Sequence, residues 1–236
     1  MTSASDPPAP RGFNPGLGAI RLVAFDLDGT LIDSIGDIAT SVNEALLETY
    51  GDGVRLPQQT VRGFVGGGAR QLVERCLASL ERPAPDAGPV FERFLAIYSS
   101  RCIETTRLYD GMAEVMDVIE RSAKLAILTN KPGFLSRTIV KELGLEGRFI
   151  SVVGGDDFKT KKPDPEGLLF LGARAGVRPE EVALVGDSAV DIKTARNARA
   201  VAIGVRWGYD NEAMEREIPD RMVESPAELA RLFLAQ

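Results

Sequence analysis

The sequence contains no histidine, and this absence excludes several classes of enzyme. Without histidine there is no Ser-His-Asp or Cys-His nucleophile and no metal site built on imidazole ligands. Acid and base catalysis must therefore come from carboxylates, lysine or tyrosine.

Cysteine is nearly absent as well, with only Cys76 and Cys102 in the chain. Both lie in stretches with helical spacing of apolar residues, and their separation does not fit a metal site, so we expect two buried, reduced thiols. A cytoplasmic location is the default expectation. No apolar run approaches the length of a membrane span. Residues 1–18 are rich in Pro, Gly, Ala and Ser and lack the apolar core of a signal peptide, so we expect a flexible N-terminal extension.

Positively charged residues are fewer than negatively charged ones, and the formal net charge is -6. An excess of acid repels nucleic-acid backbones, so nucleic acid is not an expected partner. A phosphate group could bind only where a local cluster of donors overrides the overall charge. The 236 residues, of which 44% are hydrophobic, are enough to bury a substantial core.

The most informative stretch is a short apolar run that ends in two carboxylates. Residues 22–25 are all apolar, as in a strand covered on both faces, and Asp26, Asp28 and Gly29 follow. Alternation along a strand would send both carboxylates to the same side, where they repel each other unless a cation or a proton intervenes. Taken alone, the pattern is more typical of aspartates that cap a turn or a helix, so the decision depends on the rest of the chain.

A stretch of about 70 residues between Asp33 and Leu108 has only helical signals. It is too long for a connection within a compact sheet, which indicates a separate small helical module. We therefore predict an N-terminal extension (1–18), an α/β core (19–33 and 108–236) and an inserted helical domain (34–107).

The insertion has one unusual segment, Gly66-Gly67-Gly68. Three adjacent glycines leave a backbone that can approach a ligand closely. A flexible turn between helices explains them equally well, and the sequence does not separate the two interpretations.

From Gly111 onward, helical and strand patterns alternate. Strands are predicted at 125–128, 150–153, 182–185 and 201–205, the last being the final clear strand, and helices at 111–121, 135–143, 165–175, around 192–195 and at 227–234. This alternation predicts a doubly wound parallel sheet, a Rossmann-like α/β fold in which ligands bind beyond the carboxyl ends of the strands.

Polar groups are concentrated at those predicted strand ends. Asp26 and Asp187 offer hard oxygen ligands, the backbone carbonyl of Asp28 is placed to add another, and Asp191 lies one helical turn beyond Asp187. Oxygen ligands without histidine or cysteine favour Mg²⁺ over zinc or copper.

The same edge supplies donors for an anion. Thr129 and Asn130 follow the second strand, and a lysine comes from the run 159–162. A lysine run alone is more typical of a solvated loop, but Pro163 and Pro165 stiffen the backbone and could fix the direction of Lys162. Carboxylates, Mg²⁺, lysine and hydroxyls together indicate phosphoryl transfer.

Four motifs resemble those of the haloacid dehalogenase-like superfamily of phosphotransferases: Asp26-x-Asp28-Gly29-Thr30, Thr129-Asn130-Lys131, Lys162-Pro163 and Gly186-Asp187-Ser188-x-x-Asp191. Their order and spacing match from Leu22 to Tyr209. Within the superfamily the chain looks most like the phosphoglycolate phosphatases.

The resemblance implies a role for each matching position. It implies a nucleophile (Asp26), a general acid/base (Asp28), phosphate ligands (Thr129 and Asn130), a charge-stabilising lysine (Lys162), a Mg²⁺ ligand (Asp187) and a supporting carboxylate (Asp191). It also implies that the insertion is a cap over the site, with Gly66 to Gly68 and Arg70 facing the substrate.

We therefore predict a Mg²⁺-dependent phosphatase that acts through an aspartyl-phosphate on a small anionic phosphate ester, with 2-phosphoglycolate the leading candidate. A sugar phosphatase, a pyrophosphatase or a phosphosugar mutase would use the same core. A phosphate-sensing or binding protein is the alternative from another class, and such proteins usually lose a catalytic carboxylate. The oligomeric state is open.

Overall fold

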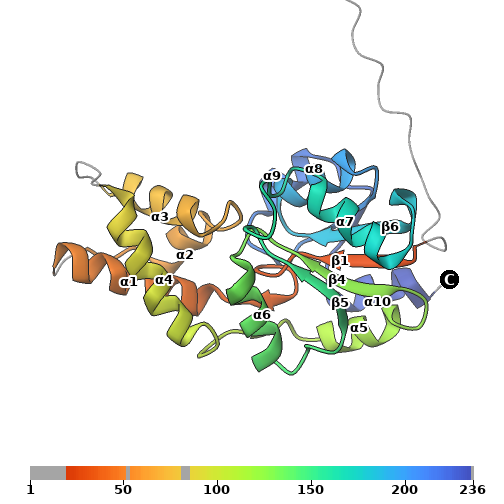
Figure 1. The fold of residues 1–236 in the computed structure, drawn as a ribbon, viewed down its shortest axis with the longest axis horizontal. Coiled ribbons are helices and arrows are strands. Elements are labelled where there is room, and N and C mark those ends of the chain that lie inside the picture. The colour runs from red at the N-terminus through yellow and green to blue at the C-terminus, as the bar shows by residue number, and fades with distance from the viewer. Residues whose placement is uncertain (1–19, 52–53, 81–85, 235–236) are drawn as a thin grey trace, which may run out of the picture.

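The computed structural model describes residues 20–51, 54–80 and 86–234 (Figure 1). The predicted N-terminal extension, residues 1–18, lies outside these ranges. No helix within them is both long enough and apolar enough to cross a membrane.

Six parallel strands form the main sheet, in the order β5-β4-β1-β6-β7-β8. The central strand β1 (Leu22–Phe25) pairs with β4 (Lys124–Leu128) on one side and with β6 (Val182–Gly186) on the other. The strands β5 (Phe149–Val153) and β7 (Val201–Val205) flank this trio. The doubly wound parallel sheet expected from the sequence is confirmed.

Strand β1 is apolar throughout because helices cover both faces of the sheet. Leu22 and Ala24 pack with residues of α7 (Glu166–Ala175) and α8 (Ala189–Asn197). Val23 and Phe25 point to the other face, toward α5 (Met112–Ile119), α6 (Gly133–Glu142) and α10 (Pro226–Leu234). Each face therefore takes alternate residues of the strand, which buries its whole length.

The prediction that 201–205 is the last strand is wrong. A short strand β8 (Arg221–Val223) extends the sheet in parallel beyond β7, after the helix α9 (Asn211–Arg216). Only Val223 of the three strand residues is fully buried. A three-residue edge strand with two partly exposed residues has no continuous apolar run, so its sequence carries little strand signal.

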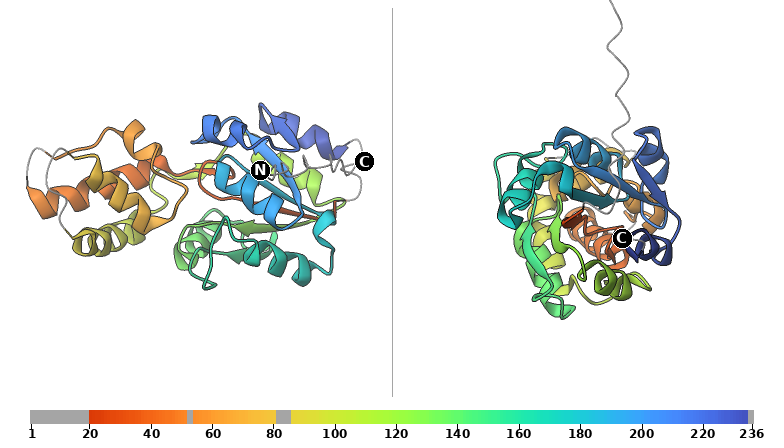
Figure 2. Two further views of the ribbon diagram at one scale, coloured as in Figure 1. Left: turned by 90° about the horizontal axis from the view of Figure 1, so that it is seen from above. Right: turned by 90° about the vertical axis from the view of Figure 1, so that its right-hand side faces the viewer.

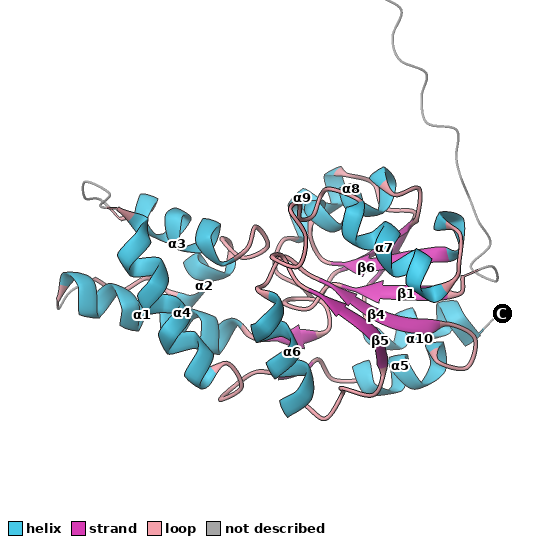
Figure 3. Cartoon of the chain, viewed as in Figure 1, coloured by secondary structure: helices cyan, strands magenta, loops and turns pink. Residues whose placement is uncertain are grey.

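After β1 the chain leaves the sheet, and its described residues there form a group of four helices, here called the helical insertion (Figures 1 and 3). These are α1 (Ile35–Tyr50), α2 (Gln58–Arg62), α3 (Ala69–Ala78) and α4 (Ala87–Arg101). Helices α1 and α4 pack along each other, and α3 packs on α4. Viewed from above, the helices form a body beside the sheet, joined to it by two adjacent segments (Figure 2).

The two joining segments are tied together. Strand β2 (Ile32–Asp33) precedes the insertion, β3 (Arg107–Leu108) follows it, and the two pair antiparallel. The buried Asp37 carboxylate accepts hydrogen bonds from the backbone N–H groups and hydroxyls of Thr105 and Thr106, at 2.6–3.1 Å. A charged acceptor with four donors fixes the entry to the insertion against its exit.

Candidate active site

The loops that follow β1, β4 and β6 converge at the edge of the sheet that faces the insertion. Asp26, Thr129 and Asp187 are each the first residue after one of these three strands. Because the strands are parallel neighbours, their carboxyl ends meet at one edge. A cavity of about 40 Å³ opens there, lined by core residues and by Gly66, Gly68 and apolar side chains of the insertion.

The buried ammonium group of Lys162 lies between two carboxylates. Its Nζ is 2.9 Å from Asp26 Oδ1 and 2.6 Å from Asp191 Oδ1. Asp191 is fully buried and also accepts the Ser188 N–H and hydroxyl at 3.1 and 2.6 Å. The lysine run is therefore not entirely a solvated loop, since Lys159 and Lys161 are exposed while Lys162 reaches the site.

The charges of these groups depend on one another. Burial raises the pKa of Asp26 to about 6, against the opposing attraction of Lys162. Burial also disfavours the charged form of Lys162, but Asp191 and Asp26 outweigh it and raise its pKa above the usual value. At neutral pH the site thus holds an ionised Asp26 beside a permanent positive charge.

Asp187 is held by two donors and enclosed by two glycines. Its carboxylate accepts the Thr30 hydroxyl at 3.0 Å and the Tyr209 N–H at 2.6 Å. A Cβ at Gly29 would lie 2.5 Å from Asp187 Oδ2, and one at Gly208 only 2.0 Å from Asp187 Cβ. Burial, followed by the charges of Asp26 and Asp191, raises the pKa of Asp187 to about 8.

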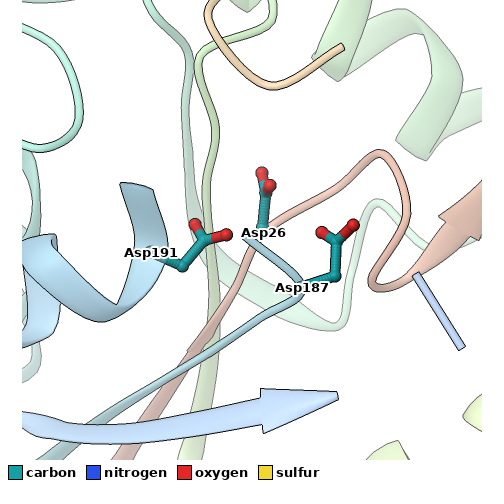
Figure 4. Close-up of side chains that lie close together, drawn as sticks. All are labelled: Asp26, Asp187 and Asp191. Carbon is teal, nitrogen blue, oxygen red and sulfur yellow. The ribbon is translucent and has the colours of Figure 1, made fainter. Parts of the chain in front are cut away.

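Asp26, Asp187 and Asp191 together fit a divalent cation. One oxygen from each lies within 4.8 Å of the others, and Figure 4 shows the three carboxylates turned toward a shared space. Lys162 supplies one positive charge against three buried carboxylates. Burial, and after it the neighbouring carboxylates, raises the pKa of Asp26 and of Asp187. A hard cation with oxygen ligands such as Mg²⁺ would favour their ionised forms.

The side chain of Asp28 faces a different cation from Asp26. It accepts two hydrogen bonds from Lys131 Nζ, at 2.9 and 3.0 Å, and one from the Ser34 hydroxyl at 2.5 Å. Both aspartates line the cavity, but Asp28 lies past the end of β1, in a turn. Strand alternation therefore does not govern its direction, and its side chain stays apart from the three-carboxylate cluster.

Thr129 and Asn130 both line the cavity, as expected for phosphate ligands. Asn130 also connects loops, because its amide nitrogen donates to the carbonyls of Gly66 at 3.0 Å and Lys162 at 3.1 Å. Its buried Oδ1 has no hydrogen-bond partner among the described residues. The Thr129 hydroxyl accepts the Lys131 N–H at 3.2 Å.

The glycine segment lies at the cavity, where its backbone can approach a ligand, whereas Arg70 lies away from the cavity. Gly66 and Gly68 line the cavity, and the Gly67 carbonyl accepts a hydrogen bond from Lys161 at 2.7 Å. Arg70 is outside the cavity lining. Its guanidinium lies over the ring of Phe91 and 3.7 Å from Glu74, on the exposed side of α3.

Sequence reasoning missed several residues at the site, of which Lys131 and Tyr98 are the most prominent. Lys131 appeared only as the third letter of the Thr129-Asn130-Lys131 motif, and nothing in the sequence of the predicted helical domain singled out Tyr98. Both line the cavity. Their contacts join segments 33 and 103 residues apart, a separation that no local pattern reports.

The loop after β7 contacts Thr30 and Asp187, two residues of the site. Trp207 Nε1 donates to the Thr30 carbonyl at 3.0 Å, and Tyr209 holds Asp187 through its N–H. Arg62 of the insertion donates to the Gly208 carbonyl at 2.6 Å and lies over the Tyr209 ring. The aromatic residues Trp207 and Tyr209 lie outside the cavity lining.

Known proteins resemble this chain in sequence and in fold. The sequence model of the haloacid dehalogenase-like hydrolases matches residues 23–205. A phosphoglycolate phosphatase of Agrobacterium fabrum is 35% identical over 88% of this chain and 90% of its own length. One of Chromobacterium violaceum is 38% identical over 80% of this chain and 86% of its own.

Solved structures give the same result. The crystal structure of a protein from Haemophilus somnus, described as a predicted phosphoglycolate phosphatase, superposes with a TM-score of 0.84 at 27% identity. The match covers 92% of this chain and 99% of that one. The chain therefore belongs to the haloacid dehalogenase-like hydrolase family and is a hydrolase whose relatives are phosphatases.

Proposed function

We propose that this protein is a Mg²⁺-dependent phosphatase that hydrolyses a small phosphate monoester, 2-phosphoglycolate being the leading candidate, through an aspartyl-phosphate intermediate. The observation that carries the proposal is the placement of Asp26, which lines the cavity with Lys162 Nζ 2.9 Å from its carboxylate. The names of the curated relatives support the choice of substrate.

In the first half of the reaction, an oxygen of Asp26 attacks phosphorus and the bond from phosphorus to the ester oxygen breaks. Asp26 is suited to this because its pKa of about 6 leaves it ionised at neutral pH. Lys162 stabilises the negative charge on the transferring phosphoryl group, and the Thr129 hydroxyl and the loop around Asn130 hold its oxygens. Asp28 gives a proton to the departing ester oxygen.

In the second half, Asp28 takes a proton from water, and the water oxygen attacks phosphorus. The bond from phosphorus to Asp26 breaks, which releases inorganic phosphate and restores the carboxylate. Asp28 can serve both steps because it lies beside the cavity and apart from the metal-binding carboxylates. The two aspartates of the motif thus have separate tasks.

Mg²⁺ would be held by the carboxylates of Asp26 and Asp187 and the Asp28 backbone carbonyl, with Asp191 in support. When bound, it would shield the negative charge between phosphate and carboxylates. The helical insertion would act as a cap, since Gly66 and Gly68 form part of the cavity wall and their loop is fastened to the core by Asn130 and Lys161. A cap at this place excludes water from the phosphoryl group.

Phosphate release from 2-phosphoglycolate tests the proposal. We expect turnover that needs Mg²⁺ and falls by at least about a thousandfold in Asp26→Asn, since the amide is a poor nucleophile. Asp164→Asn is the matched control, because Asp164 is exposed on the loop beside Lys162 and should leave the rate unchanged. Near-normal hydrolysis by Asp26→Asn would sink the covalent mechanism, and turnover undiminished by chelation would sink the metal assignment.

A rate survey with Mg²⁺ decides the substrate. It compares 2-phosphoglycolate with sugar phosphates, other small esters and pyrophosphate at equal concentration. A clear preference for 2-phosphoglycolate supports the full proposal. A flat profile would remove the substrate assignment and leave the phosphatase activity in place.

A further inference from the structure

A second buried ammonium group, that of Lys131, lies at the cavity and has no direct role in the proposed attack on phosphorus. Its side chain is 4% exposed, and it lines the cavity together with Asp26 and Asp28. A buried lysine is costly unless its charge is compensated. In this structure Asp28 and Tyr98 compensate it, and Asp28 is the residue that the proposed mechanism engages with the substrate.

Tyr98 brings a hydroxyl from α4 of the insertion to the same place. Its Oη accepts a hydrogen bond from Lys131 Nζ at 2.5 Å, and the ammonium also lies 4.5 Å from the centre of the ring. Because Lys131 is the donor, the hydroxyl hydrogen of Tyr98 is left to point elsewhere. Burial raises the pKa of Tyr98 well above its usual value, so the hydroxyl keeps this hydrogen.

The remaining cavity wall beyond the phosphoryl site is apolar. It includes Ile38, Val65, Leu72, Phe94 and Leu135, together with Ala69, Pro132, Gly66 and Gly68. Arg70, the cation that the resemblance placed here, is turned outward to Phe91 and Glu74. Lys131 and Tyr98 are thus the polar side chains that a substrate meets there, apart from the residues assigned to the chemistry.

We propose that Lys131 and Tyr98 form a subsite for a carboxylate on the leaving group, and that they make this enzyme selective for short phosphate esters carrying such a carboxylate. A carboxylate has two acceptor oxygens. The Tyr98 O–H can donate to one of them, and Lys131, whose three N–H groups contact Asp28 and Tyr98 here, can donate to the other when Asp28 turns from it to the substrate. The apolar wall limits the carbon chain that joins the carboxylate to the phosphate. The inference rests on the proposed phosphatase function and names how its substrate is chosen.

The test compares two esters of nearly equal size, 2-phosphoglycolate and 2-hydroxyethyl phosphate, which lacks the carboxylate. The native enzyme should prefer 2-phosphoglycolate in kcat/KM by about 10- to 100-fold, the range for a charged hydrogen-bonded contact. Lys131→Met should slow both esters, because Lys131 also contacts Asp28, but it should lower kcat/KM for 2-phosphoglycolate at least about tenfold more than for 2-hydroxyethyl phosphate and so abolish the preference. Tyr98→Phe, which keeps the ring, should reduce the preference by a smaller factor.

Lys159→Met is the matched control, because Lys159 is exposed on the loop that carries Lys162. It removes the same charge without touching the subsite, so the preference should persist. If Lys131 acted only by positioning Asp28, Lys131→Met would slow both esters equally, and this result would overturn the inference. Thermal melting of each variant verifies folding, and Tyr98→Phe decides the matter if Lys131→Met does not fold.

Binding separates this inference from the proposed function. In the Asp26→Asn background, calorimetry with Mg²⁺ should show 2-phosphoglycolate binding at least about tenfold more tightly than 2-hydroxyethyl phosphate, and Lys131→Met should remove the difference. If the Asp26→Asn protein with Lys131 in place binds both esters equally, the proposed subsite is overturned. If the native enzyme hydrolyses neither ester, the proposed function fails, while the binding comparison still decides the subsite.

Discussion

Replacing the carboxylate of Asp187 by an amide should stabilise the protein in the absence of metal. Asp187→Asn keeps the side-chain size and removes a carboxyl group whose ionised form is disfavoured by burial. The new amide oxygen can accept the Tyr209 N–H, and the Thr30 hydroxyl can reverse to accept from the new amide nitrogen, because a hydroxyl both donates and accepts. The substitution therefore retains both hydrogen bonds of Asp187.

The pKa of Asp187 sets the size of the effect. Burial and the charges of Asp26 and Asp191 raise it from 3.8 to about 8. Each tenfold change in the proton equilibrium is worth about 1.4 kcal/mol, so the shift costs the folded state about 4 kcal/mol at pH 7. We expect Asp187→Asn to recover about 2 to 4 kcal/mol of the free energy of unfolding.

The pH dependence follows from the direction of the shift. The folded protein holds a proton on Asp187 that the unfolded chain releases near pH 4. The stability contributed by this group is therefore fully present below about pH 4 and is lost as the pH rises through about 8. Asp26, with its pKa of about 6, adds a loss of the same sign at lower pH.

Urea denaturation in EDTA at pH 5, 7 and 8 measures this. The native protein should lose stability across the range, and Asp187→Asn should lose less. Asp191→Asn is the matched control with the opposite sign, since it removes a partner of Lys162 and should destabilise. Added Mg²⁺ should stabilise the native protein and not Asp187→Asn. An Asp187→Asn variant no more stable than the native protein at pH 8 would refute the reasoning.

Three further substitutions test the supports of the site. Lys162→Met leaves two buried carboxylates without their ammonium, so we expect a loss of about 3 to 5 kcal/mol in urea denaturation and no turnover. Gly208→Ala places a Cβ 2.0 Å from Asp187 Cβ, so Mg²⁺ affinity measured by calorimetry should fall at least about tenfold while the protein stays folded. Asp37→Ala leaves the N–H groups of Thr105 and Thr106 without their acceptor, so the free energy of unfolding should fall by about 2 to 5 kcal/mol.

Each of these has a matched control. For Lys162 the control is Lys161→Met, at its exposed neighbour, and for Asp37 it is Asp117→Ala, which removes an exposed partner of Arg148. Each control should lower the free energy of unfolding by less than about 1 kcal/mol. Gly63→Ala should be tolerated, because its nearest atom would be 3.6 Å from the new Cβ. Results equal to those of the controls would contradict the proposed roles of Lys162, Gly208 and Asp37.

The sheet and its catalytic edge could be predicted from the sequence because their signals are local. Residues 22–25 and 182–185 are buried apolar runs that end in aspartate, and parallel strands must bring such ends together. The pattern that placed Asp26 and Asp187 at one edge therefore needed no knowledge of distant contacts. The supporting glycines and the Tyr209 N–H became visible only once the loops were packed.

The parts that the sequence did not reveal depend on contacts between distant segments. In the sequence Lys131 is only one residue of a motif, and its contact with Tyr98 of α4 is visible only in the structure. In the sequence Asp37 is an acidic residue in the first turn of α1. No nearby residue indicates its hydrogen bonds with Thr105 and Thr106, which lie 68 and 69 residues further along the chain. Side-chain direction at these positions is set by how the insertion meets the core.

The pairing of β2 with β3 has an evolutionary consequence. Asp33 and Arg107 are direct partners in this small ladder, so the chain leaves the core and returns to it at one point. A segment whose two ends adjoin can be exchanged for another of different length without shifting the register of the six strands. In evolution the insertion could thus be replaced whole while the candidate-site residues of the core keep their places.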